Sequence, residues 1–251
     1  MAVQQRQEAL NLTEPPRPRL PPAWMSVVRH NLIDCPKPGR RHQLAISTDA
    51  HGRYALSFTS GGLLVREADE VASVYLRERD WGTVRQVAIE GNLLQARTTS
   101  SSVRVTRETI QRLSVLDDAE LELLADSSLT ERCHLMWVAA CRGYELIGDF
   151  AEEVLRERYL LLTPTLSADH FDRFITGKSL WHPELDELKA STRTRLRQNL
   201  FRMIHEAGLC SEDGDILPAV LSERVHDALA ARTPSDVRFL PTNLPTEVCP
   251  R

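Results

Sequence analysis

Apolar residues recur at helical spacing along most of this chain, between positions 54 and 231. In one stretch Leu64, Ala68, Val71 and Tyr75 are separated by four, three and four residues, which places them on one face of an α-helix. No alternation of apolar and polar residues is long enough to predict a β-sheet. The sequence therefore predicts an all-α protein.

Proline-rich segments bound this helical region on both sides. The N-terminal part contains TEPPRPRLPPAW and DCPKPGRRHQ, and the chain ends in RTPSDVRFLPTNLPTEVCPR. Because proline lacks an amide hydrogen and fixes φ, such segments do not form regular helices. We expect a Pro-rich arm over residues 1–53, a helical subdomain over 54–163, a second one over 164–231 and a flexible tail over 232–251.

The composition is that of a globular protein long enough to bury a core, with 251 residues of which 42% are hydrophobic. The net charge of −4 excludes a generally basic, histone-like nucleic-acid binder. Any site for a polyanion must therefore be a local cluster of basic side chains. The five cysteines are scattered and form no CxxC pair, which indicates a reducing compartment.

Neither a signal peptide nor a membrane span is visible in the sequence. The first twenty residues are polar and Pro-rich. The most apolar run, LMWVAAC at 135–141, is far shorter than the roughly 20 residues that a span requires. We expect a cytoplasmic protein that does not enter a membrane.

One candidate nucleic-acid site is the third predicted helix, which starts in the Ser/Thr cluster at 98–102. Two short predicted helices and a break at Gly91-Asn92 precede it, an order that is typical of a helix-turn-helix. A helical wheel puts Val103, Thr106, Ile110, Leu113 and Leu116 on one side and Arg104, Arg107, Glu108 and Gln111 on the other.

Arg and Gln suit this role because both can make bidentate contacts to base edges, and Arg also pairs with phosphate. We expect nucleic-acid contacts from Arg97, Arg104, Arg107 and Gln111. Glu108 lies on the same predicted face, where it would repel phosphate. A solvated polar face is the alternative.

A second candidate is STRTRLRQNLFRMIHEAGL, residues 191–209, in which Ser191 or Thr192 is the expected helix cap. Leu196, Leu200, Met203, Ile204 and Ala207 form the predicted buried side, opposite Arg195, Gln198, Arg202 and His205. Arg193 and Arg197 border the apolar stripe. The predicted nucleic-acid contacts here are Arg193, Arg195, Arg197 and Arg202.

The alternative for this helix is a solvated face with intramolecular ion pairs. Arg193 and Arg197 could pair with acids just upstream, namely Glu184, Asp186 or Glu187.

Catalytic, metal and cofactor motifs are not found. The adjacent carboxylates Glu152-Glu153 and Asp117-Asp118 point about 100° apart on a helix and cannot act on one bond. The histidines are dispersed, and SGGLL lacks the lysine of a phosphate-binding loop. Cys133, His134 and Cys141 do not have the spacing of zinc ligands. We predict a non-enzymatic protein without catalytic residues, metal or cofactor.

Four segments together resemble one family, the BrxA proteins of bacteriophage exclusion (BREX) defence systems. They are YALSFTSGGLLVREADEVASVYL, IEGNLLQARTTSSSVRVTRETIQRL, LIGDFAEEVLRERYL and STRTRLRQNLFRMIHEAGL, in the family's order. The resemblance covers roughly residues 54–230. It implies a helical, non-enzymatic protein that binds double-stranded DNA beside a DNA methyltransferase and other BREX components. A likeness of the family to the NusB-type helical fold leaves RNA as an alternative ligand.

Two hypotheses follow. In the first, the chain is a DNA-binding accessory protein of a phage-defence system that contacts duplex DNA mainly through Arg–phosphate interactions. In the second, it is a protein–protein adaptor that bridges defence components with little DNA contact. The acidic net charge and the Pro-rich arm favour the second.

Overall fold

The computed structural model describes residues 52–58 and 62–243 of the chain. Within these residues the fold is all-α, as predicted, and the only β-pairing in them consists of the isolated bridges Thr165–Asp215 and Cys210–Ile216. The predicted Pro-rich arm lies outside the described residues except for Gly52 and Arg53.

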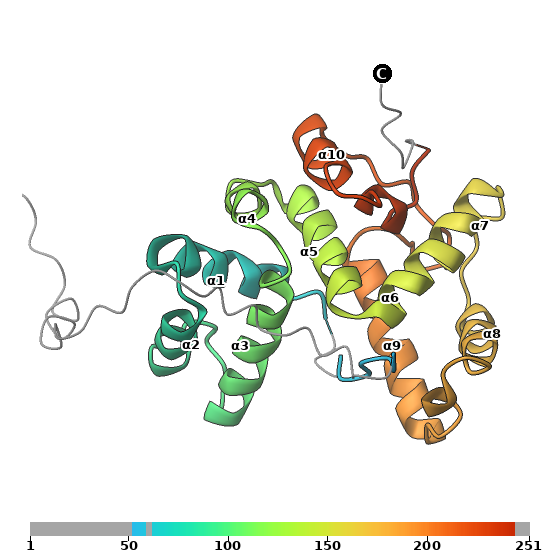
Figure 1. The fold of residues 1–251 in the computed structure, drawn as a ribbon, viewed down its shortest axis with the longest axis horizontal. Helices are drawn as coiled ribbons and strands as arrows, with labels where there is room; N and C mark the ends of the chain where they lie inside the picture. Colours follow the sequence, from blue (N-terminus) through green and yellow to red (C-terminus); the bar gives the residue numbers. More distant parts are fainter. Residues whose placement is uncertain (1–51, 59–61, 244–251) are drawn as a thin grey trace, which may run out of the picture. The chain divides into compact units, whose positions relative to one another are not determined.

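The first three helices form a group at one side of the structure (Figure 1). Their bounds are Val65–Glu78 for α1, Trp81–Glu90 for α2 and Thr99–Leu113 for α3. The Asp80 side chain caps α2 by accepting a hydrogen bond from the Thr83 amide at 2.6 Å. Thr98 caps α3 through the Ser101 amide at 3.1 Å. Both helices therefore begin where a short polar side chain satisfies a free amide.

The next helices run through the centre of the fold. They are α4 (Asp118–Ala125), α5 (Leu129–Gly143), α6 (Glu145–Phe150), the π-helix η2 (Ala151–Arg156) and α7 (Glu157–Leu160). Asp117 with Glu120 and Ser128 with Glu131 form capping boxes that start α4 and α5. Every residue of α5 from His134 to Cys141 is buried, so α5 is the central helix of the core.

Apolar residues recur all round the helical stretch from Glu131 to Leu162, but the structure divides this stretch into α5, α6, η2 and α7. The chain leaves helical geometry at Tyr144, which has φ −138° and ψ 101°. The Tyr144 hydroxyl donates a hydrogen bond to Glu108 at 2.8 Å, deep in the core. A contact with a distant helix therefore accompanies the break, and local apolar spacing does not reveal such a contact.

The remaining elements are α8 (Ala168–Lys178), the 3₁₀-helix η3 (Pro183–Leu185), α9 (Ala190–Glu206), α10 (Glu223–Ala230) and the 3₁₀-helix η4 (Asp236–Phe239). The cap predicted for α9 is wrong: Lys189 occupies the N-cap position, two residues before Ser191, and Ser191 and Thr192 lie within the first turn. The apolar side predicted for α9 is confirmed, since its five residues are all buried.

Residues 232–243 pack on the core, which corrects the prediction that a flexible tail begins at 232. The Trp137 indole Nε1 donates a hydrogen bond to the Phe239 carbonyl at 2.8 Å. Asp236 is buried and lies 2.7 Å from an Arg142 guanidinium nitrogen. Val237 and Leu240 are fully buried. Residues 244–251 lie outside the described part.

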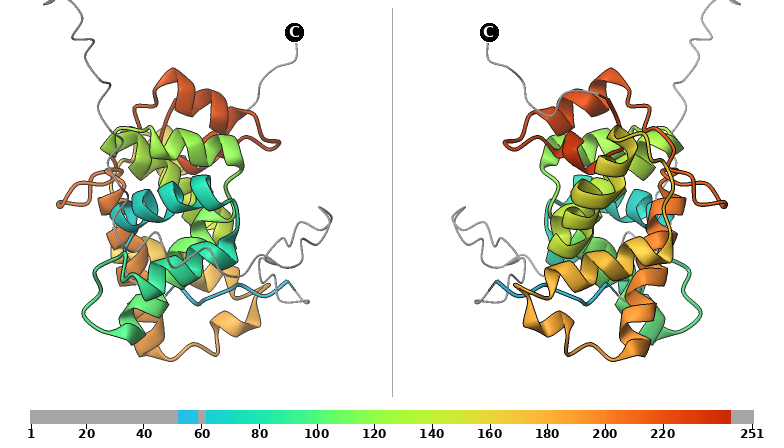
Figure 2. Two further views of the ribbon diagram at one scale, coloured as in Figure 1. Left: turned by 90° about the vertical axis from the view of Figure 1, so that its left-hand side faces the viewer. Right: turned by 90° about the vertical axis from the view of Figure 1, so that its right-hand side faces the viewer.

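One continuous hydrophobic core runs through the described residues. Helix α5 packs against α1, α3, α4, α6 and α9. The two side views show α1–α3 toward the viewer from one side and α7 and α8 from the opposite side (Figure 2). The boundary between subdomains at 163 and 164 stays a prediction.

Candidate nucleic-acid interface

Helix α3 presents a single polar stripe to solvent. Ser100, Arg104, Arg107 and Gln111 are exposed at spacings of four, three and four residues. No acidic residue lies in the first turn of α3, which leaves its positive N-terminal end uncompensated. The exposure predicted for Arg104, Arg107 and Gln111 is therefore confirmed.

Glu108 does not share this stripe, contrary to the prediction. Its carboxylate lies in the core, with Oε1 3.0 Å from Nη2 of Arg112, whose side chain is fully buried. Arg112 also donates to the Gly62 carbonyl at 2.7 Å. Burial and the neighbouring Glu108 carboxylate raise the pKa of Tyr144, so the Tyr144 hydroxyl stays protonated and donates to Glu108. The acid expected to repel phosphate is thus neutralised inside the protein.

The connection between α2 and α3 is a structured turn that ends at Arg97. Asn92 and Gln95 have φ values of 44° and 51°, in the left-handed region. The Asn92 side chain accepts from the Ala96 amide at 3.0 Å and donates to the Ala96 carbonyl at 3.2 Å. This clamp presents Arg97 to solvent immediately before the Thr98 cap. The connection from Gly91 to Thr98 is longer than the 3–4 residues of a typical helix-turn-helix turn.

The surface of α2, this turn and α3 is basic. From Trp81 to Ser114 the exposed charged residues are four arginines and one carboxylate, Glu90. The arginines are Arg85, Arg97, Arg104 and Arg107. Among the residues that the structure describes, none of these four has an ion-pair partner. Arg85 was missed in the sequence, although its position in the middle of α2, between the buried Val84 and Ala88, is one that a helical wheel would have marked as exposed.

Two of the four α9 arginines are tied to α8. Arg197 Nη1 lies 2.8 Å from Asp172 Oδ2, and Arg193 Nε lies 3.2 Å from Asp172 Oδ1. Arg193 also donates to the Asp172 carbonyl at 2.8 Å. Asp172, on α8, replaces the upstream acids expected from the sequence. Glu184 and Glu187 lie instead near Arg53, at 3.9 and 3.8 Å.

The other two α9 arginines differ from each other. Arg202 Nε lies 2.8 Å from Glu206 Oε1, one turn further along the helix. The Glu206 carboxylate also accepts a hydrogen bond from the Leu63 amide. Arg195 is exposed and, within the described part of the chain, has no ion-pair partner. Of the four α9 arginines predicted to contact nucleic acid, only Arg195 is thus without an ion-pair partner among the described residues.

Helices α3 and α9 do not form one joint basic helix pair. The central helix α5 packs against both of them. Their N-terminal ends nevertheless lie on the same, lower side of the fold in Figure 1. The candidate cations thus lie on two separate helices, Arg104 and Arg107 on α3 and Arg195 on α9, with Arg97 in the turn before α3.

Residues 52–58 and 62–243 contain no cluster of metal-binding side chains. No group of three or more His, Cys, Asp or Glu side chains there could hold a metal ion. Cys141 is fully buried, and burial raises the pKa of its thiol. Within the same residues, no helix combines the length and the apolar character needed to cross a membrane.

Comparisons with known proteins converge on one family. The BrxA family model matches residues 52–233. The BREX protein BrxA of Escherichia coli O9:H4 is 27% identical over 59% of this chain and 70% of its own length. The BREX protein BrxA of Paramagnetospirillum magneticum is 23% identical over 65% of this chain and 82% of its own.

A solved structure shares the fold. It is described as the crystal structure of an uncharacterized protein from Magnetospirillum magneticum, and it superimposes with a TM-score of 0.63 at 22% identity. The match covers 75% of this chain and 98% of that one. At this identity the likeness bears on the fold alone.

Proposed function

Because the chain belongs to the BrxA family of BREX phage-defence systems, we propose that it is a non-enzymatic accessory protein that binds duplex DNA. Phosphate contacts come from Arg97, Arg104 and Arg107, with Arg85 beside them and Arg195 as an outlying contact. Gln111 extends the α3 stripe toward the bases. In this reading α2 and α3 act as a helix-turn-helix-like element with a lengthened turn.

The observation that carries this proposal is the inward position of Glu108. With Glu108 buried against Arg112, the exposed charges between Trp81 and Ser114 are four positive and one negative, on a chain whose net charge is −4. A local excess of unpaired arginines on an acidic protein is the electrostatic pattern of a phosphate-binding surface. Because these four arginines have no ion-pair partner among the described residues, binding phosphate does not require an ion pair to be broken.

The proposal is tested by titrating a fluorescent DNA duplex with the full chain at several salt concentrations. Arg104→Ala/Arg107→Ala should weaken binding and reduce the slope of log K against log salt by about two, since each phosphate contact contributes about 0.9. Arg77→Ala is the matched control, because Arg77 is exposed on the neighbouring α1 but already lies 2.8 Å from Glu78. Salt-insensitive binding, or an equal loss in the control, would contradict the proposal.

The same protein and duplex can be used to test the remaining expectations from the family. Double-stranded RNA used as a competitor distinguishes DNA from RNA as the preferred ligand. Residence in the cytoplasm and a DNA methyltransferase partner are part of the proposal. Co-purification with the methyltransferase that survives nuclease and high salt would favour the adaptor hypothesis over one in which DNA links the two proteins.

A further inference from the structure

More than half of the exposed large apolar side chains lie in two short segments of the chain. Of the nine in the described residues, five lie in the short segments 160–162 and 180–181. Leu162 is 87% exposed and Trp181 is 82% exposed. Single exposed apolar residues are common on soluble proteins, but a cluster that includes tryptophan is typical of a protein-binding surface.

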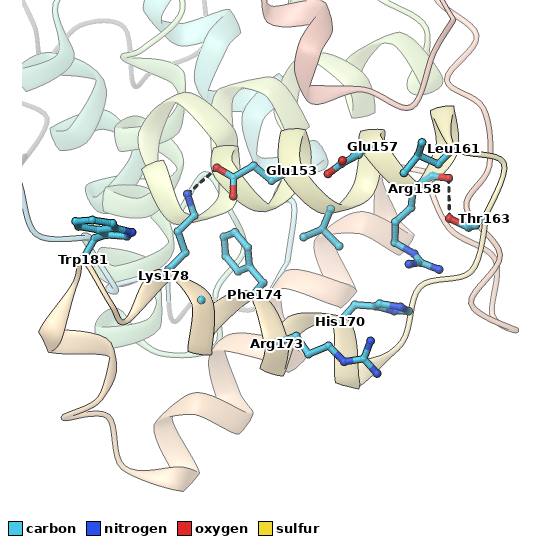
Figure 3. Close-up of a pocket in the computed structure, with 12 residues that line it drawn as sticks. Glu153, Glu157, Arg158, Leu161, Thr163, His170, Arg173, Phe174, Lys178 and Trp181 are labelled. Atoms are coloured by element: carbon cyan, nitrogen blue, oxygen red, sulfur yellow. Dashed lines mark hydrogen bonds and ion pairs between the residues drawn. The ribbon is translucent and has the colours of Figure 1, made fainter.

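These two segments lie at opposite ends of one groove, of about 680 Å³ (Figure 3). Its upper wall is formed by η2 and α7 and its lower wall by α8, which runs antiparallel to them. Val154 and Phe174 line it, and Gly177 opens it because no side chain fills the space there. Leu161 lies at one end and Trp181 at the other.

The groove is electrically asymmetric. At the Trp181 end, Lys178 Nζ lies 2.6 Å from both Asp149 Oδ2 and Glu153 Oε1, so its charge is compensated. At the Leu161 end, Arg158 donates only to the uncharged Thr165, and Arg173 has no partner among the described residues. Cationic charge is therefore uncompensated at one end only.

His170 adds a hydrogen-bond donor to the same end. Its Nδ1 accepts the Ser167 amide hydrogen bond at 3.0 Å, which leaves the proton of the neutral ring on Nε2. Burial and the nearby Arg158 and Arg173 guanidiniums lower the pKa of His170, so the ring stays neutral near pH 7. Asp169, next to His170, acts in the opposite direction on this pKa but does not reverse the lowering. Glu157, the acid that lines this end of the groove, points its carboxylate along α7 and away from the two arginines (Figure 3).

We propose that the groove between α7 and α8 binds an acidic amphipathic segment of another protein of the defence system. Apolar side chains of the segment would pack on Val154, Phe174 and Trp181, and a carboxylate would lie at the Leu161 end against Arg158 and Arg173. A helix lying in a groove between two antiparallel helices is an established mode of recognition. This site is independent of the α3 surface and does not rest on DNA binding.

The apolar content distinguishes this site from a nucleic-acid surface. Phosphate-binding surfaces are dominated by basic and polar side chains. Here the exposed Trp181 lies at one end of the groove and the exposed Leu161 at the other, and the charged rim is mixed in sign. Tryptophan and arginine are also the residues most enriched among those that dominate protein-binding free energy.

The test uses synthetic peptides of about 20 residues that tile the other proteins of the same BREX system, probed with the full chain. The expected hits combine apolar residues at helical spacing with Asp or Glu. Trp181→Ala should weaken binding of a hit by at least about thirtyfold, the effect of a dominant interface residue. Arg173→Glu should weaken it by about tenfold or more, and replacing the acid of the peptide by its amide should do the same. Both altered side chains are exposed, so neither change disturbs the core.

Leu129→Ala is the matched control, because Leu129 is 67% exposed but lies on α5 outside the groove. The affinity of this variant for a peptide hit should equal that of the unaltered chain. The proposal would be overturned if peptide affinity were unchanged in both Trp181→Ala and Arg173→Glu. It would also be overturned if Trp181→Ala changed the molar mass of the protein in solution, because the groove would then be a self-association surface. A third contrary result is loss of duplex DNA binding in Arg173→Glu without loss of peptide binding.

Discussion

Glu108 and Arg112 lie one turn apart on α3, and both point into the core, with 3.0 Å between Glu108 Oε1 and Arg112 Nη2. Helix α3 packs against α1 and α2 on one flank and α5 on the other, so more than its apolar stripe is covered. Tyr144 and the Gly62 carbonyl complete the hydrogen bonding of the pair. This pairing leaves the outer face of α3 without a carboxylate.

Breaking the Glu108–Arg112 pair should destabilise the fold strongly. Glu108→Ala leaves a buried guanidinium without its counter-charge, and we expect a loss of about 3–5 kcal/mol in the free energy of unfolding, measured with urea at pH 7. The double change Glu108→Leu/Arg112→Met removes both charges and should recover part of that loss, because the Tyr144 hydroxyl and the Gly62 carbonyl still lose their partners. Its DNA affinity should match the unaltered chain, because neither side chain is exposed. A double variant as unstable as the single one would contradict the assignment.

Releasing the α9 arginines should increase DNA affinity. Asp172→Ala frees Arg193 and Arg197 from the carboxylate that neutralises them, while the stability loss should stay below about 1 kcal/mol because the groups are partly exposed. Affinity for a duplex should exceed that of the unaltered chain at low salt, and the two affinities should become equal at high salt. Asp169→Ala on the same helix is the control, since Asp169 has no ion pair among the described residues. An equal rise in the control would show a general charge effect.

Attachment of α10 to α5 should weaken in acid. The Arg224 guanidinium and the Ser222 hydroxyl, with the Ser128 amide, hold the pKa of Glu131 well below its ordinary value of 4.5. A folded-state pKa that is lower than the unfolded one stabilises the protein above the unfolded pKa and loses this effect as pH falls below it. The stability difference between the unaltered chain and Glu131→Gln should therefore be constant at neutral pH and shrink below about pH 4.5. A difference independent of pH in urea unfolding from pH 7 to 3 would contradict this.

The segment around η4 should be essential for stability. A chain ending at Ser235 loses the buried Val237, Phe239 and Leu240, and we expect a cost above about 4 kcal/mol at roughly 1.5–3 kcal/mol per side chain. Trp137 also loses its acceptor at the Phe239 carbonyl, which should shift its fluorescence to longer wavelength. A chain ending at Asn243 keeps all these contacts and is the control. Equal stability of the two truncated chains would contradict the packing.

Much of the fold is readable from the sequence because its determinants are local. Asp80 and Thr98 start α2 and α3 where their side chains reach an amide three residues on. The apolar spacing of α9 predicts its buried side correctly, since a rigid helix fixes which residues share a face. The break at Tyr144 and the docking of η4 are not readable in this way, because they depend on Glu108 and Trp137 in distant helices.

The sequence by itself determined the all-α class, the start of α3, the buried side of α9, the family and the exposure of Arg104, Arg107 and Gln111. Only the tertiary structure decided which charges remain available, turning Glu108 inward and assigning Asp172 to Arg193 and Arg197. Helical periodicity acts over a few residues and is written in the sequence. An ion pair across the fold depends on which helices meet, and the local spacing of residues along the chain does not reveal that.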